Sequence, residues 1–145
     1  MNKKYTCFIM LAFFSLSFNI NAQNPAWIWA KRAGGTNFDY GYSVCNDASG
    51  NVFVTGTFSS QNITFGSYTL TKTGAGYSTD IFLVKYDSQG NVLWAKSAGG
   101  TSDDSGESVC VDTNGNVFVT GYFKSSTITF GSYILSNAGN ADVLL

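Results

Sequence analysis

Short apolar runs, separated by turn-forming residues, make up the chain from residue 27 onward. The runs have the length of strands and are rich in Val, Ile, Phe and Tyr. None shows the 3.6-residue period of an amphipathic helix. We therefore predict an all-β chain with no helix longer than two turns in 27–145. The expected main strands lie at 42–47, 51–58, 80–87 and 91–97, with a smaller hairpin at 63–71.

Three copies of the motif Asp-x-x-Gly-Asn, beginning at Asp47, Asp87 and Asp112, connect these runs. Asp at the first position of a type I turn caps backbone N–H groups. Gly at the fourth position takes a positive φ and forms the bulge of a hairpin. Alternating oxygen-bearing residues also suggest a calcium loop, but each copy offers one carboxylate, too few for a tight Ca²⁺ site. We expect hairpin turns and no metal.

The chain after residue 22 contains two copies of one repeat unit. When 29–70 is placed over 94–135, 29 of the 42 positions are identical. After Tyr133 the alignment slips by three residues, so that Asp80 corresponds to Asp142, and the sequence ends partway through the second copy. We expect the first repeat at 23–93, with an unpaired N-terminal strand, and a truncated second repeat at 94–145.

The predicted strands carry apolar residues on both faces, as in Val52-Phe53-Val54 and Ile81-Phe82-Leu83-Val84. A sheet with one face in water would instead alternate apolar and polar residues. Radially repeated four-stranded sheets supply cover on both sides. The predicted fold is therefore two tandem antiparallel four-stranded blades of an incomplete β-propeller, and a β-sandwich is the alternative.

The repeated strings Gly-Gly-Thr-x-x-Asp-x-Gly, Asp-x-x-Gly-Asn-Val-Phe-Val-Thr-Gly and Asp-Ile-Phe-Leu-Val-Lys-Tyr-Asp resemble the SBBP-type β-propeller repeat over essentially all of 27–145. That repeat is common in secreted and surface proteins of Bacteroidetes-like bacteria. Members often end in a sorting domain for type IX secretion, and no such tail is present in this sequence. The resemblance thus implies a fold and an exported protein, and it specifies no biochemical role.

The first 22 residues have the pattern of a secretory signal peptide. Lys3 and Lys4 precede an apolar run that extends to about residue 18, and a small residue, Ala22, follows polar positions. The run is short for a membrane span. We expect cleavage after Ala22 and no membrane span afterwards; a retained anchoring helix is the alternative. The expected location is the cell surface or the exterior, or the periplasm without a sorting tail.

The amino-acid composition excludes several kinds of catalytic and binding site. The chain has no His, a single Glu and a net charge of −1. A polybasic nucleic-acid binder is therefore excluded, and most acid–base and metal-hydrolase sites cannot be built. We expect no catalytic residues and no cofactor.

The two copies differ most in 37–42 and 102–107. Loops that diverge between repeats are either solvated connections or binding loops, and both interpretations remain open. The candidate ligand-binding residues are Phe38, Tyr40, Tyr42, Asp103, Asp104 and Glu107. Asp39 and Asp104 occupy equivalent positions, which suggests a shared turn.

Cys45 and Cys110 also occupy equivalent positions. Such positions in neighbouring blades lie about 10 Å apart, too far for a disulfide. We expect both thiols to be buried between blades.

These observations favour an exported, non-catalytic interaction or structural module that binds an unidentified protein or glycan. The alternative is part of a propeller-type polysaccharide lyase or glycosidase whose catalytic residues lie in other blades. Such an enzyme needs carboxylates about 5–10 Å apart, for which Glu107 and Asp104 are the nearby pair. Because repeat arrays usually need about three units, we expect further blades in a longer chain or an oligomer.

The two ends hold complementary halves of one hairpin. Residues 27–31 match a strand that should follow an Asp-Ile-Phe-Leu-Val strand, and 142–145 begin a strand of that type. We expect 27–31 to be an unpaired edge here, too far from 142–145 to pair within one chain.

Overall fold

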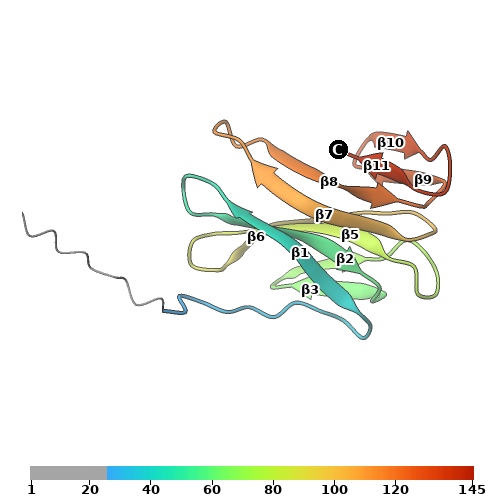
Figure 1. The fold of residues 1–145 in the computed structure, drawn as a ribbon. Helices are drawn as coiled ribbons and strands as arrows, with labels where there is room; N and C mark the ends of the chain where they lie inside the picture. Colours follow the sequence, from blue (N-terminus) through green and yellow to red (C-terminus); the bar gives the residue numbers. More distant parts are fainter. Residues whose placement is uncertain (1–25) are drawn as a thin grey trace, which may run out of the picture.

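A computed structural model of the protein describes residues 26–145, and they form an all-β fold (Figure 1). The predicted signal peptide lies outside the described residues. The first sheet has the strand order β1-β2-β5-β6, and every neighbouring pair is antiparallel. Its strands are β1 (Asp39–Asn46), β2 (Val52–Phe58), β5 (Asp80–Tyr86) and β6 (Val92–Ala98).

The second sheet repeats this order as far as the described chain extends. It runs β11-β8-β7, again antiparallel. Its strands are β7 (Asp104–Val111), β8 (Val117–Phe123) and β11 (Asp142–Leu144). Each sheet carries one small hairpin, formed by β3 (Asn62–Phe65) with β4 (Tyr68–Thr71) and by β9 (Thr127–Phe130) with β10 (Tyr133–Ser136).

The predicted strands of the first unit are confirmed to within a few residues. β1 begins at Asp39 rather than at residue 42, because a bulge between Gly41 and Ser43 lets the strand continue beyond the apolar run. The described residues contain no helix, so none there is long and apolar enough to cross a membrane.

The hairpin turns have the expected chemistry. Gly50, Gly90 and Gly115 adopt φ values of +77°, +79° and +84°. In each turn the Gly N–H donates to the carbonyl of the first residue, Asp47, Asp87 or Asp112. The Asp-x-x-Gly-Asn prediction is therefore confirmed as a type I turn closed by a bulge at Gly.

The two sheets stack face to face, with β7 lying across β1 and β2 (Figure 1). Ile81 and Ala98 of the first sheet form one buried cluster with Phe123, Ile128 and Leu144 of the second unit. Polar contacts also cross the interface: Thr57 Oγ1 donates to the Asp104 carbonyl, and the Val109 N–H donates to Ser43 Oγ. The stacking buries apolar groups from both sheets, as blades require.

The first unit has an equivalent core in which the N-terminal segment takes the place of a preceding sheet. Phe58, Ile63 and Phe82 form this core, and their repeat equivalents are Phe123, Ile128 and Leu144. Ala33 packs against it, as its equivalent Ala98 packs against the second core. Segment 27–33 thus packs on the first core as β6 packs on the second core.

The expectation for the chain ends agrees with this arrangement. Residues 27–31 form no strand, and β11 pairs with β8 and with no other strand of the described residues. The N-terminal segment therefore has the position of a fourth strand without its hydrogen-bonded neighbour.

The two cysteines correct one expectation. Both are free thiols, but Cys110 is exposed and Cys45 is only partly buried. Cys110 lies opposite Phe118 on the face of the second sheet that points away from the first sheet. Nothing among the described residues covers that face, so the prediction that both thiols are buried between blades is wrong.

Candidate functional site

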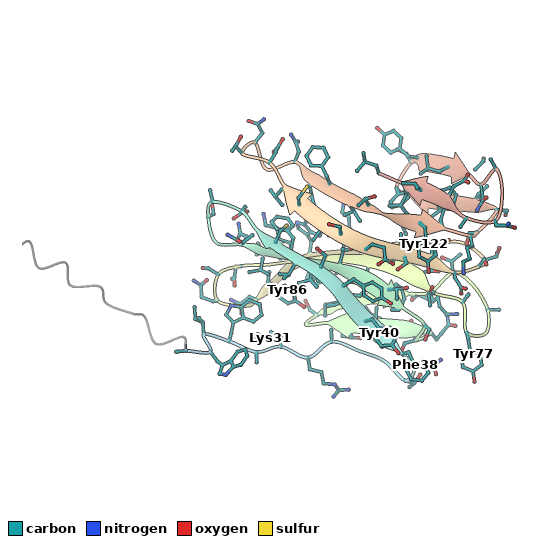
Figure 2. The ribbon with its side chains drawn as sticks, viewed as in Figure 1. Lys31, Phe38, Tyr40, Tyr77, Tyr86 and Tyr122 are labelled. Carbon is teal, nitrogen blue, oxygen red and sulfur yellow. The ribbon has the colours of Figure 1, made fainter. Side chains whose placement is uncertain are left out.

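Three aromatic side chains from the divergent segment form a row on and just before β1. The rings of Phe38 and Tyr40 lie 6.2 Å apart at 4°, and those of Tyr40 and Tyr42 lie 6.2 Å apart at 14°. Their i, i+2, i+4 spacing and the bulge at Tyr42 keep all three on one side of the strand. All three rings are exposed, and Figure 2 shows Phe38 and Tyr40 at the start of β1. We call Phe38, Tyr40 and Tyr42 the aromatic row.

Glu107 places a carboxylate near one end of the aromatic row. Partial burial raises the pKa of the Tyr42 hydroxyl above its usual value, and the negative charge of Glu107 raises it further. Glu107 is exposed, and its Oε1 accepts a hydrogen bond of 2.6 Å from Ser105 Oγ. The structure thus brings an aromatic side chain, Tyr42 of β1, close to an acidic one, Glu107 of β7.

Asp103 immediately precedes β7. Its Oδ2 is 3.4 Å from Lys124 Nζ, and both side chains are nearly half exposed. An exposed pair of this kind contributes little to stability. Asp103 remains accessible to a partner.

Asp104, by contrast, is fully buried and holds the loop that precedes β7. Oδ2 accepts hydrogen bonds from the Gly100 N–H and from Ser125 Oγ at 2.9 and 2.7 Å, and Oδ1 accepts from the N–H groups of Lys124 and Ser125. Both oxygens are occupied, so this carboxylate is not presented to a ligand. It cannot form an accessible pair with Glu107 in this arrangement.

Asp39 accepts three of the four equivalent hydrogen bonds in the first unit. Its carboxylate accepts hydrogen bonds from the Gly35 N–H, the Ser60 N–H and Ser60 Oγ. The shared Asp of the Gly-Gly-Thr-x-x-Asp motif therefore ties the glycine loop to the serine that follows the second strand. This position is structural in both units.

Sequence reasoning did not identify a buried polar cluster in 72–80. Lys72 is buried, and its Nζ donates to the carbonyls of Gly74 and Gly76 and to Ser78 Oγ. Asp80 is buried as well, and its Oδ1 has no hydrogen-bond partner in the described structure. The three-residue slip between the repeats was the available signal, because it marks a longer connection in the first unit.

The turn carboxylates are used within their own turns. Asp112 Oδ1 accepts from the N–H groups of Asn114 and Asn116, and Oδ2 accepts from Asn116 Nδ2 at 2.8 Å. Hydrogen bonding to Asn116 lowers the pKa of Asp112, and Asn51 and Asn91 do the same for Asp47 and Asp87. Within 26–145 no three His, Cys, Asp or Glu residues are grouped as metal ligands would be.

An apolar groove of about 630 Å³ opens between the sheets. Ile81 and Ala98 line it from the first unit, and Phe130 and Leu144 line it from the second. The equivalent region of the first unit is divided into two pockets of about 360 and 220 Å³, and Tyr86 lines both. The ring of Tyr86 lies 5.6 Å from that of Trp29. The groove shares its lining with the core between the sheets.

Two comparisons with known proteins agree with this architecture. Residues 93–122 match the family model of the SBBP β-propeller repeat. The chain is also 32% identical, over 72% of its length, to an uncharacterized WD repeat-containing protein of Acanthamoeba polyphaga mimivirus, and it spans 9% of that relative. With the stacked antiparallel sheets, these matches support a β-propeller repeat protein.

Proposed function

We propose that this chain is an exported, non-catalytic β-propeller repeat module that binds a protein or glycan at the cell surface or outside the cell. The observation that carries the proposal is the aromatic row. Three parallel rings on a rigid strand present a preformed apolar surface that loses little entropy on binding.

Its surroundings support an interaction site. Glu107 supplies a negative charge near Tyr42, and the hydroxyls of Tyr40 and Tyr42 can hydrogen-bond to a partner. Divergence between the repeats is concentrated in this segment, whereas the structural Asp is shared. A scaffold that is held constant and a surface that varies are typical of a recognition site.

The test uses the purified protein on beads and the cell-envelope fraction of the organism that produces it. We expect the fraction to bind the wild-type protein, and the triple variant Phe38→Ser, Tyr40→Ser, Tyr42→Ser to lose at least about tenfold in affinity, as loss of aromatic anchors does. Tyr77→Ser is the matched control, because Tyr77 is exposed but lies in the connection before β5. Equal binding by all three proteins would show that the aromatic row is not the binding site.

The chemical class of the partner follows from treatment of the same fraction. Loss of binding after protease digestion identifies a protein, and loss after glycosidase digestion identifies a glycan. Export is tested separately by N-terminal sequencing of the protein from its producer, with Gln23 as the expected first residue. An intact Met1 would reject export through a cleaved leader.

A further inference from the structure

The two outer faces of the stacked sheets are the counterparts of the two faces that bury each other inside the chain. We define the leading face as the side of the first sheet that carries Gly41, Val44 and Val54. We define the trailing face as the side of the second sheet that carries Cys110, Phe118 and Val143. Both definitions follow from the cross-strand pairs Val44–Val54, Gly41–Gly56, Cys110–Phe118 and Val143–Tyr122.

Burial shows the relation directly. On the trailing side, Phe53 and Ile81 are 1% and 2% exposed, while their equivalents Phe118 and Val143 are 44% and 78% exposed. On the leading side, Val109 is 5% exposed, while its equivalent Val44 is 65% exposed. Each outer face therefore displays side chains that the repeat buries when a neighbouring sheet is present.

A glycine gives an independent indication. Gly106 lies against the first sheet so closely that a Cβ atom there would be 2.5 Å from Thr55 Oγ1 and 2.9 Å from Ile81 Cγ2. Its equivalent, Gly41, would place a Cβ atom no closer than 3.6 Å to Val54. Gly41 has no positive φ, and because glycine weakens a strand, its presence inside one often marks a site where another backbone approaches closely. The single chain does not need glycine at 41, but a docked neighbour does.

We infer that copies of this chain assemble head to tail, with the trailing face of one copy covering the leading face of the next. The contacts then repeat those between the two sheets of one chain. Val143 takes the position of Ile81 against Gly41, and Ser108 takes the position of Ser43 beside the Val44 N–H. Neither face carries a charged residue among those that define it, so apolar burial drives the association.

The first and last segments of the described residues fit the same assembly. Ile81 pairs with Ala98 in the first sheet, and the equivalents of these residues are Val143 and Ala33. Segment 27–33 of the next copy would therefore lie beside the open edge of β11 as its fourth strand. Heterologous contacts of this kind form closed rings or open filaments.

The test measures molar mass by light scattering during gel filtration. We expect the wild-type protein to form an oligomer of two or more copies. We expect Gly41→Val and Val143→Asp to be monomers, each with a circular dichroism spectrum and a melting transition like those of the wild type. Tyr77→Ser, on neither face, should assemble like the wild type.

Mixing the two monomeric variants is the decisive measurement. Gly41→Val keeps an intact trailing face and Val143→Asp keeps an intact leading face, so their mixture should form one junction and a one-to-one dimer. A wild-type protein that stays monomeric at its highest soluble concentration would overturn the inference. So would single variants that still assemble, or a mixture that stays monomeric. None of these outcomes depends on the aromatic row.

Discussion

At the scale of single residues, buried carboxylates determine how each glycine loop is held. Asp39 accepts three of the four hydrogen bonds that Asp104 accepts, and Asp104 is fully buried whereas Asp39 is partly exposed. Asp104→Asn keeps the shape and removes one acceptor oxygen, so a backbone N–H loses its partner. We expect a loss of about 1–3 kcal/mol in the free energy of unfolding.

Asp39→Asn is the matched control for this prediction. Water can reach its site and replace the lost acceptor, so the loss should be smaller than for Asp104→Asn. Urea unfolding of both variants measures the difference. Equal losses in unfolding free energy would show that the burial of the carboxylate does not determine the effect of the substitution.

Asp80 should impose the opposite pH dependence from the turn carboxylates. Burial raises the pKa of Asp80, so its contribution to stability is full below its unfolded pKa of about 3.9 and is lost as pH rises through the raised value. Asp47, Asp87 and Asp112 have lowered pKa values, so their contributions are lost as pH falls.

Asp80→Asn removes the pH dependence that comes from Asp80 and leaves that of the three turn carboxylates. We expect the stability of this variant relative to the wild type to increase between pH 4 and neutral pH. Unfolding free energies measured across that range test the prediction, and a constant difference would contradict it.

At the scale of elements, the sequence predicted the strands and turns because their signals are local. Apolar runs and Asp-x-x-Gly-Asn turns depend on neighbouring residues alone, so β2, β5 and their hairpins could be located. The exposure of Cys110 depends on which sheet face is covered, and the buried Lys72 ammonium is held by residues of the 72–80 connection. A repeat shows which positions are equivalent, but it does not show which of two equivalent faces has a neighbour.

The hairpin turns allow backbone strain to be separated from packing. A Cβ atom at Gly115 would have nothing within 4 Å, whereas one at Gly90 would lie 2.7 Å from Trp29 Cδ2. Gly115→Ala therefore tests positive φ alone and should cost about 1 kcal/mol. Gly90→Ala should cost more, because Trp29 must also move. Thermal unfolding compares the two, and an equal loss would show that Trp29 does not pack on this turn in solution.

At the scale of the whole molecule, the N-terminal segment substitutes for part of a preceding blade. Trp29 covers the first core and contacts Tyr86, whereas Trp27 is almost fully exposed (Figure 2 shows Tyr86 beside this segment). We expect Trp29→Ala to lower the unfolding free energy by about 2 kcal/mol, since the ring is only partly buried. Trp27→Ala should stay within about 0.5 kcal/mol of the wild type. Urea unfolding distinguishes them.

The same segment should report on assembly through hydrogen exchange. Residues 27–33 have packing contacts but form no strand, and the backbone bridge nearest to them is the isolated Gly34–Thr64 pair. Their amides should therefore exchange rapidly in the monomeric Gly41→Val variant, even though Trp29 is held against the core. In assembled wild-type protein, pairing with β11 of a neighbour should slow exchange at 31–33 and at 143–145. Protection of 31–33 in the monomeric variant would contradict this, because it would require a partner strand within the same chain.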